Sequence, residues 1–579
     1  MRLILRFLKP HWKLCTLTIF LLIVDVAGAL IIPTLASQML REGVAGVAMQ
    51  TLIYTAITMA VAAIISGAAG ILSGYTCAAL VARVAKDMRD ALYRKSLALA
   101  VADFKTFSVA SMTTRTVSDV TNIQFALMSS LQMVLPVPIV FVISLILAFL
   151  QDWMMGLILL AVLFIITVIA LMIMRSASPL FRKLQKLLDK MSTVLLENIT
   201  GVRVVRAFNK EQDEKGRMDG AFSDYAYTSI KANRMFASLD GLSFFAVNLF
   251  VILVYSFSGF RVTAGAFAVA DITALVEYAL LALFYLMMAQ MVILTLPRAF
   301  ECAERVRTVL DFSPTIQDHT EKDVWFPASP ENVVTFQNVA FRFADSSLYT
   351  LKNLNFSCRR GTTTAIIGGT GSGKSTVASL ILRFNDVTEG ELLLDGIDIR
   401  KMPQKQLRDH IAYVQQRAWL FAGTIAENLR YSNPNATDEE LWHALKVAQA
   451  EDFVRSLPDG LNSYVAQGGT NFSGGQKQQL SIARALVKKP ELYIFDDSFS
   501  ALDFKTDAAL RRALAYETQN AAVLIIAQRV STILHAEQIV VLNEGEPVGI
   551  GTHQELLLTC PVYKEIYESQ TKEAQEQHV

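Results

Sequence analysis

The chain has 579 residues, enough for two or more domains, and 53% of them are hydrophobic while only 18% are charged. Soluble globular chains carry about a quarter charged residues, so this composition argues against an entirely soluble protein, and the apolar excess lies almost wholly before residue 300. The net charge of +1 gives no reason to expect a nucleic-acid partner. The five cysteines have no paired spacing, so the sequence suggests neither a disulfide framework nor a zinc site, and we expect buried thiols: Cys15, Cys77, Cys302, Cys358 and Cys560.

The N-terminal residues MRLILRFLKPHWK alternate basic and apolar side chains, which predicts a short helix at the membrane surface. The apolar run that follows is long enough to span and has no small-residue cleavage site, so we expect no removable signal peptide. A hydrocarbon core of about 30 Å needs about 20 apolar residues. Six stretches meet this length: about 14–35, 52–78, 130–150, 154–174, 240–260 and 273–296.

Basic residues gather before the first span and after the second and fourth, whereas the other connecting loops carry few. The positive-inside rule therefore predicts a multi-pass protein of the cell membrane, such as a bacterial inner membrane, with both termini in the cytosol. The segments 79–129 and 175–239 are too long for simple loops and have helical apolar spacing. We expect membrane helices that continue into the cytosol; the alternative is two small inserted domains.

Three polar residues stand out within the spans. Asp25 and Glu277 are ionisable groups at membrane depth, where they usually face a cavity or a partner, so either could mark a substrate path. The alternative role is a hydrogen bond between helices. Gln290 lies beside the adaptable methionine and aromatic side chains of LFYLMMAQM, a segment that suits either a substrate surface or bundle packing.

A change of composition divides the rest of the chain. Residues 301–332 turn to charge and proline, which is typical of a linker between a membrane domain (1–300) and a second domain (333–579). In the second domain a predicted strand, TTTAIIG, leads into GxxxxGK[ST] and then into a predicted helix. This is a phosphate-binding loop, in which Lys374 reaches the β- and γ-phosphates of a nucleotide and Ser375 ligates Mg²⁺. Its residues are Gly368, Gly369, Thr370, Gly371, Ser372, Gly373, Lys374, Ser375 and Thr376.

Two more phosphate-related motifs follow. Ser473, Gly474, Gly475 and Gln476 open an amphipathic helix and offer a hydroxyl, bare amides and a helix dipole to an anion. One phosphate loop and one separate anion cradle in a single chain imply that the two belong to different nucleotide sites. The apolar run ELYIFDD then supplies Asp496, which we expect to hold Mg²⁺ through water.

The order of these motifs resembles the nucleotide-binding domain of an ABC transporter, and the six spans resemble an exporter-type half-transporter. The resemblance implies an all-α six-helix membrane domain followed by an α/β P-loop ATPase domain, with ATP and Mg²⁺ as cofactors. It also implies a dimer in which each ATP lies between the phosphate loop of one chain and the FSGGQ segment of the other. Further positions that it assigns are Phe343 for adenine stacking, Gln416 for Mg²⁺, Asp503 in SALD, and coupling helices at about 103–115 and 212–222.

Two positions that serve hydrolysis depart from the family pattern. The Glu that polarises the attacking water is replaced by Asp497, one methylene shorter, and the His that contacts the γ-phosphate is replaced by Gln528. Loss of a general base costs about 10²–10⁴ in rate. We therefore expect this site to bind ATP and to hydrolyse it poorly; the alternative is a slow but working site.

This pattern resembles the degenerate-site subunit of a heterodimeric multidrug-type exporter. The expected partners are a different half-transporter with the catalytic Glu and switch His, the lipid bilayer, and a small amphipathic substrate such as a drug or lipid. Alternative functions are import through the same fold and a nucleotide-gated channel or regulator. The intact FSGGQ segment argues against the last, because it preserves a working site for a partner.

Overall fold

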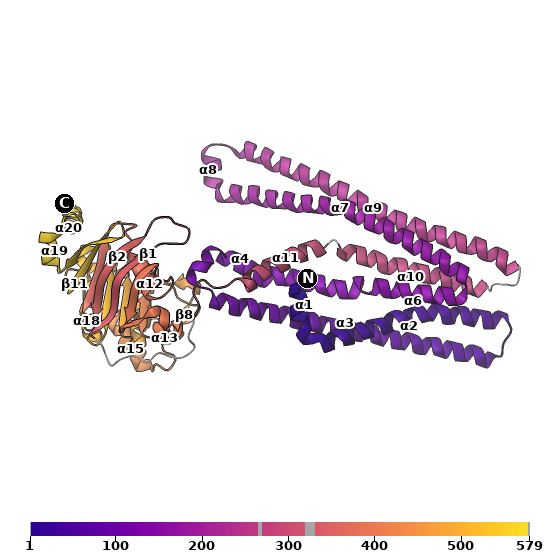
Figure 1. The fold of residues 1–579 in the computed structure, drawn as a ribbon, viewed down its shortest axis with the longest axis horizontal. Coiled ribbons are helices and arrows are strands. Elements are labelled where there is room, and N and C mark those ends of the chain that lie inside the picture. Colours follow the sequence, from indigo (N-terminus) through magenta and orange to yellow (C-terminus); the bar gives the residue numbers. More distant parts are fainter. Residues whose placement is uncertain (1, 264–268, 294, 319–330, 577–579) are drawn as a thin grey trace. The chain divides into compact units, whose positions relative to one another are not determined.

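The computed structural model describes residues 2–263, 269–293, 295–318 and 331–576. They form two compact units (Figure 1). The first contains residues 1–98 and 107–313, and the second contains residues 99–106 and 314–579. Residues 99–106, which include the short helix η2 (Val101–Lys105), thus belong to the second unit although helices of the first flank them along the chain.

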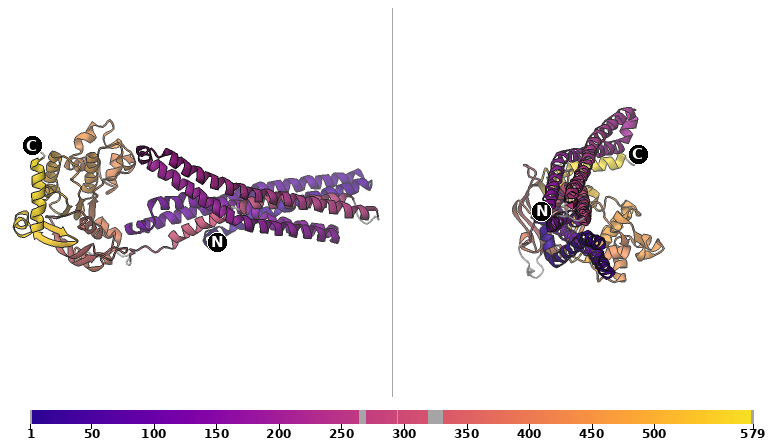
Figure 2. Two further views of the ribbon diagram at one scale, coloured as in Figure 1. Left: turned by 90° about the horizontal axis from the view of Figure 1, so that it is seen from above. Right: turned by 90° about the vertical axis from the view of Figure 1, so that its right-hand side faces the viewer.

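The first unit is entirely helical among its described residues, and its long helices run side by side in two views (Figures 1 and 2). Six of its helical stretches have the length and apolar composition to cross a membrane: Arg2–Val44, Met49–Ala98, Val109–Gln151, Trp153–Met172, Gly241–Ser258 and Ala270–Val292. The predicted class of the membrane domain is therefore confirmed. The helices of the unit are α1 (Arg2–Leu8), η1 (Lys9–His11), α2 (Trp12–Val44), α3 (Met49–Ala98), α4 (Val109–Thr114), η3 (Arg115–Asp119), α5 (Val120–Ser129), η4 (Ser130–Val134), α6 (Pro136–Gln151), α7 (Trp153–Thr200), α8 (Val202–Ala207), α9 (Glu211–Thr263), α10 (Val269–Ile293) and α11 (Leu296–Asp311).

Three helices are much longer than a bilayer requires, with 50 residues in α3, 48 in α7 and 53 in α9. The extended membrane helices expected from the sequence are therefore present, and the segments 79–98 and 175–200 simply continue α3 and α7. The turn between α7 and α9 is the short helix α8, whereas the segment 212–222 lies within α9. Gly201 ends α7, and Asn209 in the left-handed region (φ +51°) ends α8. These breaks set the position of the turn.

The sequence assigns residues 301–332 to a linker, but the structure continues α11 to Asp311. The buried residues Ala299, Cys302, Ala303, Val306 and Val309 recur every three or four positions, which is a helical face. An ion pair joins α11 to η3: Arg305 donates from Nε and Nη2 to Asp119 at 2.8 and 2.6 Å. Residues 319–330 of the predicted linker lie outside the described residues.

The second unit is built on two main sheets. A six-stranded sheet has the order β12-β11-β3-β10-β9-β6, parallel except at β12, and a four-stranded antiparallel sheet has the order β2-β1-β4-β5. Its strands are β1 (Asn332–Phe341), β2 (Leu351–Arg359), β3 (Thr363–Gly368), β4 (Glu389–Leu394), β5 (Ile397–Asp398), β6 (Ile411–Val414), β7 (Gly423–Thr424), β8 (Tyr464–Val465), β9 (Leu492–Asp496), β10 (Ala522–Ile526), β11 (Gln538–Asn543) and β12 (Glu546–Gly551).

The parallel sheet separates two apolar cores, one on each of its faces, and helices cover both cores. β9 and β10 are buried along their whole length, as expected for central parallel strands. The predicted α/β class of this domain is confirmed. The helices are α12 (Lys374–Ile381), η5 (Ile399–Lys401), α13 (Gln404–Asp409), α14 (Ile425–Arg430), α15 (Asp438–Val447), α16 (Glu451–Ser456), η6 (Gly460–Asn462), η7 (Gln467–Gly469), α17 (Gly474–Lys488), α18 (Phe504–Glu517), η8 (Val530–Thr532), α19 (His553–Thr559) and α20 (Pro561–Glu576).

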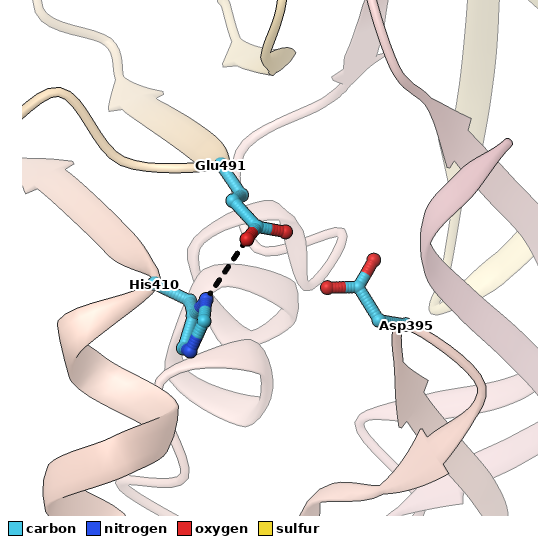
Figure 3. A group of neighbouring side chains, drawn as sticks. All are labelled: Asp395, His410 and Glu491. Carbon is cyan, nitrogen blue, oxygen red and sulfur yellow. Dashed lines mark hydrogen bonds and ion pairs between the residues drawn. The ribbon is translucent and has the colours of Figure 1, made fainter. Parts of the chain in front are cut away.

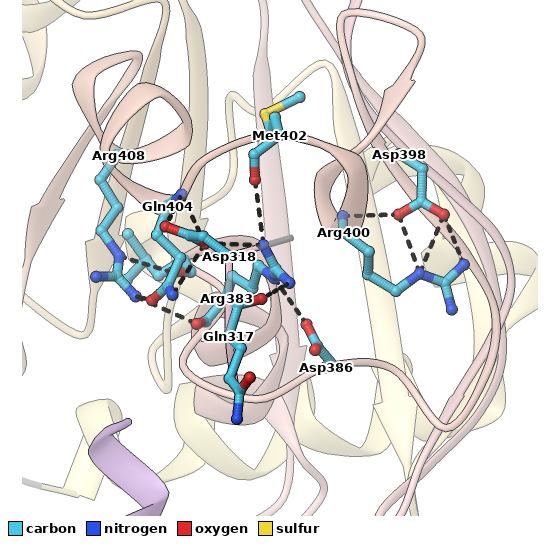
Figure 4. Close-up of polar contacts among 10 residues, drawn as sticks. Gln317, Asp318, Arg383, Asp386, Asp398, Arg400, Met402, Gln404 and Arg408 are labelled. Atoms are coloured by element: carbon cyan, nitrogen blue, oxygen red, sulfur yellow. Dashed lines mark hydrogen bonds and ion pairs between the residues drawn. The ribbon is translucent and has the colours of Figure 1, made fainter. Parts of the chain in front are cut away.

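A buried arginine joins residues 317–318 to the rest of the second unit (Figure 4). Arg383 is 2% exposed and donates to the carbonyl of Met402 at 3.2 Å and to Asp386 at 2.9 Å. It also donates to the carbonyl of Gln317 at 3.4 Å and lies 3.5 Å from Asp318. Because a buried guanidinium needs most of its donors satisfied, this network holds the chain at 317–318 in place.

Candidate nucleotide site

The predicted phosphate-binding residues gather at the carboxyl ends of three adjacent strands, β3, β10 and β9. In parallel α/β sheets this edge is the usual place for a ligand. A cavity of about 270 Å³ opens there. Its lining residues are Thr350, Thr370, Gly371, Gly373, Lys374, Ser375, Thr376, Gln416, Asp496, Asp497, Ile526 and Gln528.

The glycines at the two ends of the loop are required by its geometry. Gly373 has φ +95°, a conformation that other residues rarely adopt, and a Cβ there would lie 2.5 Å from Leu351 Cδ2. A Cβ on Gly368 would lie 2.1 Å from the carbonyl oxygen of Leu542. The loop therefore keeps its backbone close to the sheet and its amides available for phosphate oxygens.

Lys374 lies at the start of α12, with its side chain in the cavity. Its Nζ donates to the loop carbonyls of Gly368 at 2.8 Å and Gly369 at 2.7 Å. Burial lowers the pKa of Lys374, while the charges of Asp497 and Asp496 oppose this shift. The ammonium thus stands at the centre of the loop, where phosphate oxygens suit it better than neutral carbonyls.

Ser375 and Asp496 form the part of the site that suits Mg²⁺. Ser375 Oγ donates to one carboxylate oxygen of Asp496 at 3.1 Å, and the hydroxyl of Tyr413 donates to the other at 3.2 Å. Burial raises the pKa of Asp496, and the hydrogen bonds from Ser375 and Tyr413 lower it. A hydroxyl, a carboxylate and nearby phosphate oxygens are the hard oxygen ligands that Mg²⁺ prefers. The residues present therefore fit a Mg²⁺–nucleotide.

The two departures from the family pattern, Asp497 and Gln528, line this same cavity. Asp497 has φ +46°, which Asp tolerates better than most residues, and its amide donates to the carbonyl of Ile526 at 2.8 Å. Gln416 Nε2 donates to the Asp497 carboxylate at 3.1 Å. The shorter acid is thus held by the residue that the family resemblance assigns to Mg²⁺.

The FSGGQ segment lies elsewhere, at the N-terminus of α17. Ser473 caps the helix: its Oγ accepts from the Gln476 amide at 3.3 Å, and Gln476 Oε1 accepts from the Ser473 amide at 2.9 Å. Within the described chain, Ser473, Gly474, Gly475 and Gln476 are absent from the lining of the cavity. Asp503 caps α18 by accepting from the amides of Lys505 and Thr506 at 3.1 and 3.0 Å. These residues do not contribute to the 270 Å³ cavity of their own chain.

Phe343 is half-buried in the loop between β1 and β2, the same loop that brings Thr350 to the cavity. Its ring packs edge-on against Phe341, with centroids 4.8 Å apart. The sequence assigned no role to three residues of the site: Thr350, Tyr413 and Ile526. They come from strand ends that only the fold brings together.

The three polar residues that the sequence singled out in the membrane spans, Asp25, Glu277 and Gln290, have different surroundings. Ser66 of α3 donates to Asp25 of α2 at 3.1 Å, and a Cβ on Gly70 would lie 3.1 Å from the Asp25 carboxylate. Asp25 therefore joins two helices, the structural role left open by the sequence. Glu277 is exposed on α10. Gln290 is 5% exposed, and its Nε2 has no hydrogen-bond partner among the described residues.

Outside the cavity, one group of described side chains brings a histidine and two carboxylates together: Asp395, His410 and Glu491 (Figure 3). His410 Nδ1 lies 3.2 Å from Glu491. The guanidinium of Arg360 lies 2.9 Å from Glu491 and 3.7 Å from Asp395. Because Arg360 already supplies a cation, we interpret the group as a charge network. Burial and the neighbouring Glu491 raise the pKa of Asp395 to about 7.

Comparison with known proteins agrees with this geometry. Residues 15–287 match the ABC transporter transmembrane region, and residues 351–500 match the ABC transporter ATPase domain. An uncharacterized ABC transporter ATP-binding protein of Mycobacterium tuberculosis is 34% identical over 570 residues, covering 98% of this chain and 97% of the relative. The ATP-dependent lipid A-core flippase of Chromobacterium violaceum is 28% identical over 575 residues, covering 99% and 98%.

The fold has a solved counterpart. A bacterial Atm1-family ABC exporter with ATP bound superimposes with a TM-score of 0.80 at 24% identity, covering 96% of this chain and 98% of the exporter. At this identity the likeness shows the fold alone. The two family matches and the full-length relative show that the chain belongs to the ABC transporter family, with its membrane region and its ATP-binding domain in one chain and with the fold of an exporter.

Proposed function

We propose that this chain is one half of a heterodimeric ATP-driven exporter, and that its own nucleotide site binds ATP but hydrolyses it poorly. One observation carries the proposal: Asp497 and Gln528 line the same cavity as the intact binding residues Lys374 and Ser375. Both positions that serve hydrolysis in the family are altered, whereas the positions that hold the nucleotide and Mg²⁺ are kept.

The chemistry of the site follows from the reach of its side chains. Lys374 binds the phosphates, Ser375 and Asp496 hold Mg²⁺, and Phe343 stacks on the base. Asp497 ends one methylene short of the position from which Glu polarises water. Loss of that base reduces the rate by about 10²–10⁴, which is about 3–5 kcal/mol of barrier. ATP held here serves mainly to keep two chains together.

The partner supplies the working site. Ser473, Gly474, Gly475 and Gln476 do not line the cavity of this chain. The amides of Gly474 and Gly475, together with the helix dipole, can therefore close on the nucleotide of a second half-transporter. That partner carries the catalytic Glu and the switch His. The ATPase domains lie in the cytosol, and the segments 99–106 and α8 are the candidates for coupling them to the membrane helices.

The substrate class proposed is a small amphipathic molecule such as a lipid or drug. The flippase relatives are named for lipid A-core, and the spans of this chain form an apolar helical bundle with few charged side chains. Transport of labelled lipids and cationic dyes by the reconstituted pair distinguishes the two kinds of substrate.

The test restores the two altered positions. Asp497→Glu with Gln528→His is placed in a heterodimer whose partner has its catalytic Glu disabled, and trapped nucleotide is analysed at the site of this chain. We expect essentially no ADP from the original chain and measurable ADP from the double variant, because one methylene restores reach and the imidazole restores the γ-phosphate contact.

Asp452→Glu is the matched control, since it adds the same methylene on exposed α16 and should produce no ADP. Hydrolysis by the original chain at the rate of an ordinary ABC site would overturn the poor-hydrolysis assignment. An absence of ATP-dependent transport by every pairing, with ATP binding retained, would instead favour a nucleotide-gated channel or regulator.

A further inference from the structure

A lysine lies over the ring to which the adenine role was assigned. Lys105, at the end of η2, has its Nζ 4.3 Å from the centroid of the Phe343 ring. Both residues belong to the second unit. An ammonium at this distance from an aromatic face makes a cation–π contact. The face of Phe343 therefore has an occupant from the polypeptide itself.

A separate contact anchors the segment that carries Lys105. Asp103 is 3% exposed, and its carboxylate accepts from the amide of Thr315 at 3.2 Å and from the Thr315 hydroxyl. It also accepts from the amide of Ala100 at 2.9 Å, which closes η2. The position of residues 100–103 is thus fixed at Thr315, and the exposed side chain of Lys105 extends from this segment to Phe343.

The distance leaves no room for a base between the two groups. Non-bonded atoms in contact are about 3.5 Å apart, so a base inserted between the ring and the ammonium needs about 7 Å. The observed separation is 4.3 Å. The ring also packs edge-on against Phe341 and the core around it. Lys105 and an adenine base therefore exclude each other on the face of Phe343 that Lys105 covers.

We propose that Lys105 is a residue of the nucleotide site that sets its affinity for the base: it holds the face of Phe343 until adenine displaces it. This rests on the proposed role of Phe343. Residues 99–106 lie between α3 and α4 along the chain, so displacement of Lys105 reports occupancy of the base position directly to a segment joined to two membrane helices. The phosphates alone do not produce this signal.

The experiment compares ATP with inorganic tripolyphosphate, which has the phosphates and no base. Each competes with 8-azido-ATP for photolabelling of this chain in the full-length purified transporter, in the cold and without Mg²⁺. We expect Lys105→Met to tighten ATP binding by about two- to fivefold, the loss of one exposed cation–π competitor. Tripolyphosphate binding should not change.

Three further variants complete the test. Lys105→Arg keeps a cation and should bind both ligands as the original chain does. Lys405→Met removes an exposed lysine elsewhere on the same unit and should change the affinity for neither ATP nor tripolyphosphate. In a Phe343→Leu background, Lys105→Met should lose its effect. An unchanged or weaker affinity for ATP in Lys105→Met would overturn the proposal, and so would an equal change for tripolyphosphate, since Lys105 would then act on the phosphates.

Phe343→Leu also separates this inference from its premise. It should weaken ATP while leaving tripolyphosphate unchanged, because it removes the aromatic face. If it weakens neither, adenine does not stack on Phe343 and the role of Lys105 falls with it. That outcome leaves the poor-hydrolysis assignment intact, since the latter is tested by ADP formation at Asp497 and Gln528.

Discussion

Buried charges in this ATPase domain are compensated by specific neighbours, and the compensation differs between sites. Arg383 is surrounded by carbonyls and carboxylates. Asp395 is 2% exposed, has a guanidinium only at 3.7 Å, and lies beside a second carboxylate, Glu491. Removal of a buried carboxylate from water and its approach to a like charge both favour the protonated form. Asp395 therefore titrates at a higher pH than an ordinary carboxyl group, with a pKa raised to about 7.

The raised pKa makes the contribution of Asp395 to stability depend on pH. Its pKa is about 7 in the folded chain and near 3.8 in the unfolded chain, so between these values the folded state binds the proton more tightly. Its contribution to stability is thus present at low pH and lost as pH rises toward 7. The lowered pKa of Glu491 changes stability only below about pH 4.5, so it does not contribute to a difference between pH 5 and pH 8.

We therefore expect Asp395→Asn to change the apparent Tm of the ATPase domain more favourably at pH 8 than at pH 5, each compared with the original chain at the same pH. Each kcal/mol corresponds to about 2–4 °C in a domain of this size. Thermal unfolding of the purified transporter at both pH values measures this, with the exposed neighbour Asp409→Asn as control. A Tm lowered equally at pH 5 and pH 8 would contradict the assignment, because it would indicate a lost hydrogen bond.

At the scale of elements, the C-terminal helix α20 is joined to the segment that carries Gln528. Gln570 Nε2 donates to the carbonyl of Gln528 at 2.8 Å, and Gln570 Oε1 accepts from the amide of Val530 at 2.8 Å. Both contacts are to backbone atoms, so they hold whatever side chain stands at position 528. The helix thus holds the backbone of the segment that carries Gln528.

Gln570→Ala should loosen this segment while leaving the fold intact. A net hydrogen bond contributes about 1 kcal/mol, so we expect the Val530 amide to exchange with deuterium about fivefold faster. Gln570→Glu keeps the acceptor for Val530 and should give an intermediate rate. Hydrogen-exchange mass spectrometry of the peptide around 526–532 checks this, with Ser569→Ala on the exposed side of α20 as control. An exchange rate unaffected by Gln570→Ala would show that α20 does not hold the segment.

Local sequence patterns predicted the class of each domain, because span length and the strand–loop–helix order of the phosphate loop are short-range features. Contacts across the chain could not be predicted in this way. Tyr413 reaches Asp496 only because β6 and β9 are neighbours in the sheet, and Gln570 reaches Gln528 from 42 positions away. The helix α11 was obscured by its charged residues, and the position of α8 depends on where two helices end.

At the scale of the whole molecule, the residues of two incomplete nucleotide sites lie in one chain. The cavity contains Lys374 and Asp496 but lacks an anion cradle from α17, and Ser473 caps α17 away from that cavity. Two chains placed head to tail would complete both sites. We expect loss of this cradle to reduce ATP hydrolysis at the partner's site.

We expect Ser473→Ala with Gly475→Glu to collapse ATP turnover of the assembled transporter, even though we propose that the site of this chain hydrolyses ATP poorly. The serine hydroxyl and the bare Gly475 amide are both lost, and a Cβ at Gly475 already lies 3.3 Å from the carbonyl of Ala501. ATPase activity of the reconstituted pair measures this, and Ser456→Ala on α16 should leave it unchanged. Retained turnover, with the pair still assembled, would mean that this cradle serves no hydrolytic site.

The 50 residues of α3 give the helix mechanical leverage. At 1.5 Å per residue it is about 75 Å long, so a hydrocarbon core of about 30 Å leaves about 45 Å of the same rod outside it. A rod of this kind that pivots at the membrane boundary by about 7° moves its far end by about 5.5 Å, the pitch of one helical turn. Close-packed side chains can accommodate only shifts that are much smaller than this. Small rocking motions among the spans are therefore enough, in length alone, to break and remake whole contacts at the far ends of the helices.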